Sequence, residues 1–383
     1  MNKDEPIRVL VTAPLGVSGV TNLMIDIQKH IDRSRLNFDY LVYHDMKTAC
    51  EDQVYALGSR KITASADHVR FRPFRRLVRM RIIRRLCRDN RVKLLHYNAD
   101  NPADLTNIIA ARLGGVKYVT VHCHSAGYGK AGTGVKVASV LLKPFFPLFC
   151  DKLMACSELA ARFILPRYAI RGMRFELLPN GIDLNRYAFD PVTREEVRKR
   201  LGVEGRFVVG HVGRISAEKN HAFLLEVFSR VLLTAPDAVL VLFGTGPLAE
   251  EMKKKAADMG LSGSVIFYGV TDDMPRMWQA IDVFPLPSFY EGLPVSAIEA
   301  QAAGVPCVFS ENVTREADVV GGAAFLPLGD TDQWARAILA LRGRERQSGA
   351  DKLRAAHYDI RQTADRIFDL YTGIGEWARG RRP

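Results

Sequence analysis

Two periods of hydrophobic and polar positions alternate along the whole chain. Short runs of Val, Ile, Leu and Phe, typical of buried strands, are followed by longer runs in which apolar residues recur every three or four positions, as on one face of a helix. The series begins with a strand predicted over 7–12 and a helix over 20–31, and it includes a later strand over 238–243. This alternation predicts an α/β fold of parallel sheets covered by helices.

A segment rich in Pro, Gly and Asn interrupts the series at residues 177–191, with a strong Pro-Asn-Gly turn signal at 179–181. The same rhythm of strands and helices then restarts. We therefore expect two tandem Rossmann-like domains, one over 1–184 and one over 185–383, with the last helix packing back on the first domain. Because open parallel sheets bind ligands at the carboxyl ends of their strands, the expected ligand site is a cleft between the domains.

Composition places the 383-residue chain among globular proteins, since 48% of its residues are hydrophobic and 25% are charged. The best candidate for a membrane span, residues 137–150, is shorter than the ~18 apolar residues required and is broken by Lys143, Pro144 and Pro147. The N-terminal sequence is typical of a first strand and not of a signal peptide. Six cysteines without a CxxC spacing favour a reduced cytoplasm.

The net charge of +12 is distributed unevenly. Residues 1–183 hold 29 lysines and arginines against 16 acids, a charge of +13, and the rest of the chain is near neutral. Eleven of these cations lie in 70–93, which contains one acid and an apolar series at four-residue spacing: Val78, Ile82 and Leu86. The segment is a solvated basic helix, a surface for an anionic membrane, or a site for nucleic acid.

The most specific motif spans residues 287–308, PSFYEGLPVSAIEAQAAGVPCV. A predicted strand leads into a loop with Glu291 and Gly292, and Pro294 is suited to the first turn of a helix that carries Glu299. A helix N-terminus that opens onto a cleft attracts phosphate, and carboxylates beside it can accept hydrogen bonds from sugar or ribose hydroxyls. Taken singly, each glutamate is better explained as a solvated surface acid, and only the whole motif favours a binding role.

A second motif, HVGRISAEKNH at residues 211–221, joins a predicted strand to a helix. It brings Arg214, after Gly213, and Lys219 onto one loop. Both side chains stay charged, and a guanidinium can bond a phosphate bidentately, so the pair suits a diphosphate. The alternative is a loop with ordinary surface cations.

Two histidines end the strand predicted over 118–122, in the sequence YVTVHCHSAG. If the strand continues, His122 and His124 point to the same side by its two-residue period. They are then structural residues, an acid/base pair or metal ligands, and no third ligand with suitable spacing supports a metal site. Ser125 and the glycine at 127 leave room for a substrate.

Two further patterns imitate known motifs. The series Gly244-Thr245-Gly246 and its continuation match a dinucleotide fingerprint, but the next strand does not end in the acid that binds ribose, so we expect no nicotinamide cofactor. Asp330 and Asp332 form a D-x-D sequence of the kind that binds metal in some enzymes. Since they immediately precede a predicted helix, helix capping explains them better.

The two motifs together resemble the donor site of retaining glycosyltransferases of the GT-B fold, specifically glycosyltransferase family 4. The resemblance extends over nearly the whole chain and is strongest from 207 to 309. It implies that Glu291 contacts the transferred sugar, that Glu299 binds the ribose hydroxyls, and that Arg214 and Lys219 bind the diphosphate. Further residues that it implies at the donor site are Gly16, Gly19, Gly213, Gly292 and Leu293.

The family also places a histidine over the reacting sugar. His124 aligns best with this position and His122 second, with Ser125 as a further candidate near the acceptor. The implied reaction moves a sugar, with retention of configuration, from a nucleotide-sugar to a lipid-linked or glycan acceptor of bacterial polysaccharide or cell-envelope synthesis. UDP-sugars are favoured and GDP-sugars are possible donors, and no metal or other cofactor is expected.

Lipid-linked acceptors favour the membrane interpretation of the basic segment over nucleic acid. The protein is then expected to be peripheral on the inner face of the plasma membrane, with Arg75, Arg76, Arg79 and Arg84 facing the bilayer. Two other functions stay open for this architecture: a nucleotide-sugar 2-epimerase and a non-catalytic scaffold at the membrane.

Overall fold

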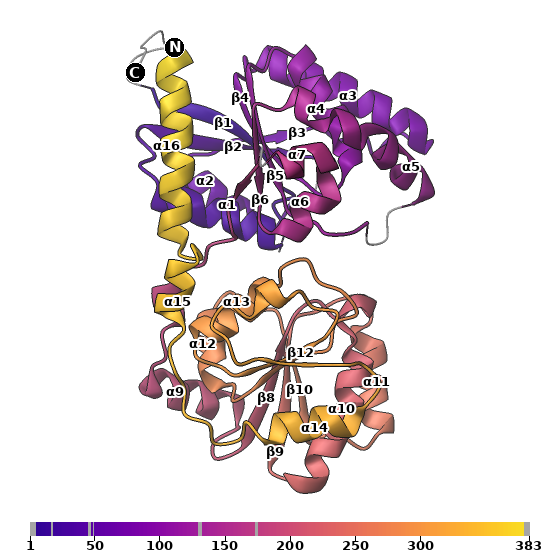
Figure 1. Cartoon of the computed structure of the whole chain (residues 1–383), viewed down its shortest axis with the longest axis vertical. Coiled ribbons are helices and arrows are strands. Elements are labelled where there is room, and N and C mark those ends of the chain that lie inside the picture. Colours follow the sequence, from indigo (N-terminus) through magenta and orange to yellow (C-terminus); the bar gives the residue numbers. More distant parts are fainter. Residues whose placement is uncertain are drawn as a thin grey trace. The chain divides into compact units, whose positions relative to one another are not determined.

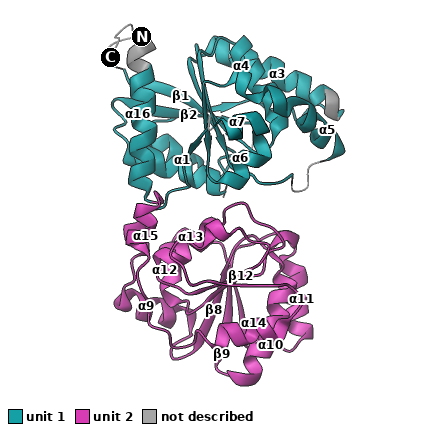
Figure 2. Ribbon diagram, viewed as in Figure 1, with its two compact units in different colours: residues 1–182, 359–383 teal, residues 183–358 magenta. Residues whose placement is uncertain are grey.

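The computed structural model describes residues 5–16, 18–44, 47–48, 50–128, 132–172 and 175–378. The chain forms two compact units (Figures 1 and 2), of which unit 1 comprises Met1–Ile182 and Asp359–Pro383 and unit 2 comprises Asp183–Tyr358. The division after Ile182 lies two residues before the expected one. The second unit does not continue to residue 383, because the chain returns to unit 1 at Asp359.

Unit 1 contains a sheet of seven parallel strands in the order β3-β2-β1-β4-β5-β6-β7. The strands are β1 (Ile7–Thr12), β2 (Leu36–Val42), β3 (Lys61–Thr63), β4 (Leu94–Ala99), β5 (Tyr118–Cys123), β6 (Lys152–Ala155) and β7 (Glu176–Leu177). Val9 in the central strand β1 is paired with Phe38 on one side and with Leu94 on the other. The strand order therefore reverses between β1 and β4.

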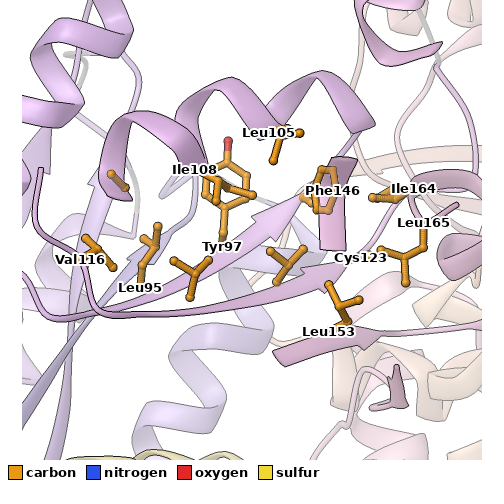
Figure 3. Packing of buried hydrophobic residues seen from close by; sticks show 14 of the residues in the cluster. Leu95, Tyr97, Leu105, Ile108, Val116, Cys123, Phe146, Leu153, Ile164 and Leu165 are labelled. Atoms are coloured by element: carbon orange, nitrogen blue, oxygen red, sulfur yellow. The ribbon is translucent and has the colours of Figure 1, made fainter. Parts of the chain in front are cut away.

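Helices cover both faces of this sheet. They are α1 (Gly19–His30), α2 (Glu51–Ala56), α3 (Arg72–Asp89), η1 (Pro102–Asp104), α4 (Leu105–Leu113), α5 (Thr133–Leu142), η2 (Lys143–Phe149), α6 (Glu158–Ile164), α7 (Arg167–Arg171) and α16 (Ile360–Ala378). Side chains of β4 such as Leu95 and Tyr97 pack against Leu105 and Ile108 of α4 (Figure 3). Alternate side chains of β1 and β2 pack on the other face, as the two-residue period of a strand requires.

The last helix, α16, belongs to the second of these cores. The backbone N–H of Ile360 donates to the carbonyl of Ile182 at 2.9 Å, and α16 then packs against α1 and β1. Its Tyr371 is fully buried, and the hydroxyl is hydrogen-bonded to Nδ1 of His96 at 2.9 Å. The core of unit 1 thus combines both ends of the described chain.

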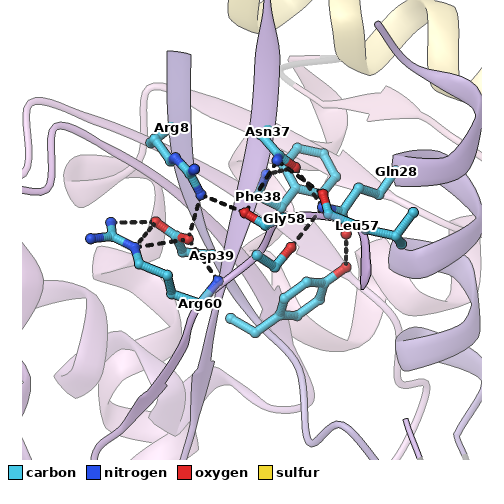
Figure 4. Close-up of polar contacts among 10 residues, drawn as sticks. Arg8, Gln28, Asn37, Phe38, Asp39, Leu57, Gly58 and Arg60 are labelled. Carbon is cyan, nitrogen blue, oxygen red and sulfur yellow. Dashed lines mark hydrogen bonds and ion pairs between the residues drawn. The ribbon is translucent and has the colours of Figure 1, made fainter. Parts of the chain in front are cut away.

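A buried polar network secures β2, whose residues are all buried (Figure 4). Asp39 accepts hydrogen bonds from Arg8 in β1 at 2.9 Å and from Arg60 before β3 at 2.6 Å. Beside it, Asn37 and Gln28 bond each other. Because a buried polar or charged group without a partner is costly, these contacts allow Asn37 and Asp39 to lie in an interior strand.

Unit 2 contains two sheets of three parallel strands, in the orders β10-β9-β8 and β11-β12-β13. The strands are β8 (Phe207–Val212), β9 (Ala238–Phe243), β10 (Val265–Gly269), β11 (Phe284–Leu286), β12 (Cys307–Ser310) and β13 (Ala324–Leu326). A bridge between Val209 and Val283 joins β8 to the start of β11, and the N–H of Gly210 donates to Val283 at 3.0 Å. The strand order therefore reverses between β8 and β11, as in unit 1.

The helices of unit 2 are α8 (Leu184–Tyr187), α9 (Pro191–Leu201), η3 (Ala217–Lys219), α10 (His221–Thr234), α11 (Ala249–Asp258), α12 (Met274–Ala280), α13 (Val295–Ala302), η4 (Arg315–Ala317), α14 (Thr331–Leu339) and α15 (Ala350–Ala355). The Asp330 side chain accepts the N–H of Gln333 at 2.8 Å and caps α14, which confirms the capping interpretation. The α/β class with two Rossmann-like units is confirmed. Within the described residues, no helix has the length and apolarity that crossing a bilayer requires.

The close approach of the returning chain generates a prediction about Gly181. A Cβ added to Gly181 would lie 2.5 Å from Oγ1 of Thr363 and 2.9 Å from Cα of Ile360. We expect Gly181→Ala to push α16 away and to destabilise unit 1 by ~1–3 kcal/mol. Urea unfolding, with hydrogen exchange of the α16 amides, measures this loss.

Gly373→Ala is the matched control in the same helix, because a Cβ at Gly373 meets nothing within 4 Å. Alanine has the higher helix propensity, so this variant should be stabilised by up to ~1 kcal/mol. Equal stability of Gly181→Ala and the wild type would contradict the close packing of Gly181 against α16.

Candidate active site

In unit 2, the residues of the two sequence motifs lie at the carboxyl ends of β8 and β11. β8 leads into Gly213 and Arg214, and η3 ends at Lys219. β11 leads into the loop that carries Glu291. These are the two strands between which the order reverses, and in open parallel sheets that point is where ligands bind.

An ion pair connects the two loops. Nζ of Lys219 lies 2.6 Å from Oε1 of Glu291, and the Ser288 hydroxyl donates to the same oxygen at 2.6 Å. The side chains of Lys219 and Glu291 are only 16% and 13% exposed. A backbone bond from Phe289 to the carbonyl of Glu218, at 2.9 Å, fixes the loops further. The structure thus brings together a cation and a carboxylate that the sequence assigns from separate motifs.

Glycines allow a third loop, after β9, to lie against this pair of loops. Gly244 has a φ of +131°, and an added Cβ there would lie 2.1 Å from the carbonyl oxygen of Gly213. At Gly246 the corresponding distance to the carbonyl oxygen of Ile215 is 2.2 Å. In this structure the G-x-G sequence therefore serves loop packing, a role that the fingerprint alone did not indicate.

The other donor-site candidates of unit 2 lie near the same edge. Arg214 is exposed, Gly292 is half-buried and Leu293 is buried. Glu299 lies on α13, which starts at this edge, and it accepts a hydrogen bond from Nε1 of Trp278 at 3.0 Å. Because Trp278 is fully buried in α12, it gives the Glu299 carboxylate a fixed orientation. The sequence motifs did not identify this tryptophan.

Two buried histidines lie near Lys219. His211 in β8 and His221 at the start of α10 have ring centroids 4.6 Å apart, and Nδ1 of His211 donates to the carbonyl of Pro285 at 2.9 Å. Burial, with the Lys219 cation nearby, lowers the pKa of His221 to about 4. Burial also holds the pKa of His211 well below its usual range. Both imidazole rings are therefore neutral at physiological pH.

In unit 1, the glycine loop follows β1. Ser18 accepts the N–H of Thr21 at 3.1 Å and caps α1, and Gly19 is its exposed first residue. A Cβ at Gly16 would meet nothing within 4 Å, so the backbone here is open to a ligand. Residue 17, which belongs to the same sequence motif, lies outside the described residues.

His124 lies beyond the end of β5 and is half-buried. Its Nε2–H donates to Oδ1 of Asn98 at 2.8 Å, and the Asn98 amide donates to the carbonyl of Thr12 at 2.7 Å. Burial, with His122 and His96 nearby, holds the pKa of His124 well below its usual range. In the neutral ring so oriented, Nδ1 is the hydrogen-bond acceptor. This atom is buried, and the side chain of Asn180 interacts with the ring.

His122 has a different environment. Its side chain is fully buried, Nε2 donates to the carbonyl of Leu178 at 3.1 Å, and burial lowers its pKa to about 4. The His122 and His124 rings are 4.1 Å apart. Ser125 donates to Asp100 at 3.3 Å. Asp100 and Asn98 are polar residues at the end of β4, and their position there is a sequence signal that the motifs left unused.

The basic segment forms α3, and its four arginines expected at a membrane differ in exposure. Arg75 donates to the carbonyl of Val69 at 2.8 Å, and Arg76 donates to that of Ala103 at 3.4 Å. The guanidinium of Arg79 lies 4.9 Å from the centre of the Tyr43 ring. Arg84 is exposed.

In the part of the chain that the structure describes, no three His, Cys, Asp or Glu side chains are grouped so that they could hold a metal ion. The charged groups at the carboxyl edges include the Lys219–Glu291 pair, Arg214 and Glu299 in unit 2, and Asp100 in unit 1. This arrangement can bind an anion through its cations and hydroxyl groups through its carboxylates.

The buried histidines generate a prediction about pH. The folded state keeps His221 neutral down to a pH near 4, whereas the unfolded chain binds a proton below about 6.5. Acidification through this window therefore favours unfolding. We expect His221→Asn to reduce the slope of unfolding free energy against pH by up to ~1.4 kcal/mol per pH unit. Urea unfolding followed by fluorescence of the buried Trp278 and Trp334 measures the slope.

His357→Asn is the control, because His357 is exposed and asparagine tolerates its φ of +65°. This variant should keep the wild-type slope. An unchanged slope in His221→Asn would show that the folded protein does not keep this imidazole neutral.

Comparisons with known proteins identify the family. The model of Glycosyltransferase Family 4 matches residues 17–186, and the model of Glycosyl transferases group 1 matches residues 206–343. Over 380 residues, 97% of each chain, the protein is 30% identical to EpsF of Bacillus subtilis (strain 168), whose name provisionally calls it a glycosyltransferase. It is 29% identical over 234 residues, 59% of each chain, to the UDP-Gal:alpha-D-GlcNAc-diphosphoundecaprenol alpha-1,3-galactosyltransferase of Escherichia coli.

Solved structures agree on the fold. Alr3699/HepE from Anabaena, solved in complex with UDP and glucose, has a TM-score of 0.75 at 19% identity over 94% of this chain and 98% of that one. The lipopolysaccharide glycosyltransferase WaaG has a TM-score of 0.68 at 15% identity, over 96% and 100% of the two chains. The chain therefore belongs to glycosyltransferase family 4 and has the GT-B fold.

Proposed function

We propose that this glycosyltransferase transfers a sugar from a nucleotide-sugar to a lipid-linked or glycan acceptor of bacterial polysaccharide or cell-envelope synthesis, with retention of configuration. The observation that carries the proposal is the Lys219–Glu291 ion pair at the strand reversal of unit 2, with Arg214 and Glu299 at the same edge. It combines cations for a diphosphate with carboxylates for hydroxyl groups. The enzyme is then peripheral on the inner face of the plasma membrane, where such acceptors are elongated.

Each charged group has a distinct task in this proposal. Arg214 and Lys219 bind the diphosphate, Glu291 accepts a hydrogen bond from the transferred sugar, and Glu299 accepts one from the ribose. Negative charge develops on the leaving diphosphate as its bond to the anomeric carbon breaks. The two cations stabilise that charge most strongly in the transition state, and the proposed reaction includes no metal or other cofactor. Gly213, Gly292 and Leu293 shape the loops around it.

Unit 1 supplies the groups for the reacting sugar and the acceptor. The neutral ring of His124 lies over the transferred sugar, and the loop with the open backbone of Gly16 and the exposed Gly19 lies against the substrates. Ser125 is a further acceptor contact. The acceptor oxygen forms the new bond to the anomeric carbon on the face that the diphosphate leaves, and its proton passes to a donor phosphate oxygen.

The relatives support a UDP-sugar as the favoured donor. The Anabaena protein was solved with UDP and with UDP-glucose, and the Escherichia coli relative uses UDP-Gal with a diphosphoundecaprenol-linked acceptor. A relative from Mycolicibacterium smegmatis, 26% identical over 263 residues, is GDP-mannose-dependent, so GDP-sugars belong in the same screen. A ligand at ~100 times its dissociation constant adds roughly 2.7 kcal/mol of stability, which thermal unfolding detects. Product analysis with and without acceptor separates transfer from 2-epimerisation.

The assigned partners of the two glutamates predict unequal effects. Glu291→Gln and Glu299→Gln should each reduce turnover. Glu299→Gln should also weaken UDP binding about 10- to 100-fold, because it removes a charged acceptor of a ribose hydrogen bond. Trp278→Phe removes the hydrogen bond that orients Glu299, and it should weaken UDP binding by less. Calorimetric titration with UDP and turnover assays make the comparison.

Glu250→Gln is the control for loss of one carboxylate charge, because Glu250 is an exposed residue of α11 in the same unit. It should keep wild-type affinity and turnover. Equal UDP affinity in Glu299→Gln and the wild type would remove the ribose assignment.

The histidine environments predict a ranking. His124→Ala should impair transfer and leave UDP affinity largely intact, since the ring is assigned to the sugar. His122→Ala should affect turnover less, but it should lower the stability of unit 1 by ~1–3 kcal/mol because it leaves the buried carbonyl of Leu178 without its donor. Turnover, UDP titration and urea unfolding are measured for both variants. The reverse ranking in turnover would assign the catalytic position to His122.

A further inference from the structure

Large apolar side chains remain exposed in two neighbouring parts of unit 1. Isolated exposed apolar residues are normal, but a cluster marks an interaction surface. Each of the following residues has more than half of its surface exposed: Phe71, Phe74 and Leu77 at the start of α3, and Val137, Val140, Leu141, Phe145 and Leu148 in α5 and η2. We call these eight residues the apolar surface.

The segment of α5 and η2 is apolar on two sides. Leu142, Phe146 and Phe149 pack into the core of unit 1. The exposed residues recur at three- and four-residue spacing on the other side, from Val137 to Leu148. The side that packs into the core stabilises the fold, whereas the exposed side makes no contribution to the core. This is the run 137–150 that is too short to span a bilayer.

The two parts of the apolar surface are both anchored at η1. Arg76 of α3 donates to the carbonyl of Ala103 in η1, and α5 packs against η1. Both parts belong to the face of the sheet opposite α1 and α16 (Figure 1). They therefore form one region of unit 1.

Cations continue this region along α3. Beyond Leu77 the exposed positions of the helix are Arg81, Arg84, Arg85, Arg88 and, at its end, Asp89. Asp89 is the one acid among residues 70–93. Its carboxylate oxygens lie 3.2 Å from Nε of Arg85 and 3.4 Å from Nε of Arg88. Residues 132–150 contain two lysines and no acid. The exposed row differs from the arginines expected from the sequence, of which it retains Arg84.

We propose that the apolar surface inserts into an anionic bilayer, at the boundary between headgroups and acyl chains, while Arg81, Arg84, Arg85 and Arg88 bind lipid phosphates. The inference deepens the proposed function, because a lipid-linked acceptor would bring the enzyme to a membrane. Apolar side chains flanked by cations are the combination that an anionic bilayer complements. A symmetric dimer would place this surface against itself and oppose like charges.

The test uses vesicle co-sedimentation of the full chain, with phosphatidylcholine alone or mixed with phosphatidylglycerol. The variant Leu141→Gln/Phe145→Gln/Leu148→Gln removes three exposed apolar side chains and should reduce binding to the mixed vesicles about 10- to 100-fold. The matched control, Val192→Gln/Leu233→Gln/Val270→Gln, changes three equally exposed residues of unit 2 and should bind as the wild type does.

A second variant changes Arg81, Arg84, Arg85 and Arg88 together to Gln. It should lose the preference for phosphatidylglycerol and the sensitivity to salt, since screening acts on the charges. Wild-type binding by either variant, or no binding by the wild type, would overturn the proposal. So would a concentration-dependent dimer, without vesicles, that the apolar variant abolishes.

Thermal stabilisation by UDP-sugars without vesicles separates this inference from the proposed function. Both variants should keep it, because none of the changed residues belongs to the donor site. Donor binding without vesicle binding rejects the membrane surface alone. Vesicle binding without any donor binding rejects the proposed function, and with it the lipid-linked acceptor as the reason for a membrane.

Discussion

Parallel strands bring every loop that follows a strand to one edge of the sheet, and both units of this protein depend on that constraint. In unit 2 the strand order reverses between β8 and β11, so the loops that follow these two strands meet at the point of reversal. The Lys219–Glu291 pair joins those loops and defines their separation. Gly244 and Gly246 after β9 allow a third loop to pack against these two loops. The buried histidines near Lys219 are neutral and add no charge to the site.

The long elements follow from the sequence because their periods are strong. β1 and β9 have the predicted limits, and the two motifs lie at strand ends as expected. The short edge strands β3, β7 and β13 were missed, because two or three residues carry no measurable period. The sequence also could not show which histidine is accessible, because His122 and His124 share a strand-like period. In the structure His122 is the fully buried one, and it is hydrogen-bonded to the carbonyl of Leu178.

The orientation of α3 shows a different limit. A series at four-residue spacing, Val78, Ile82 and Leu86, describes one side of the helix, but the most deeply buried residues are Ile83 and Cys87. Close approach of the neighbouring α4 sets this orientation, since a Cβ on Gly114 would lie 2.7 Å from Cβ of Cys87. The helix carries many arginines, and its contacts with neighbouring elements determine which arginine side chains are exposed. The composition of the segment does not contain this information.

The return of the chain to unit 1 has a consequence for biosynthesis. A ribosome releases residues in order, so all of unit 2 is made before α16 can reach the sheet to which it belongs. Until then, the nascent first unit lacks Tyr371 and the other side chains that cover one face of β1 and β2. Such incomplete cores expose apolar surface and aggregate readily. The core of unit 1 can therefore be completed only after the translation of the whole second unit.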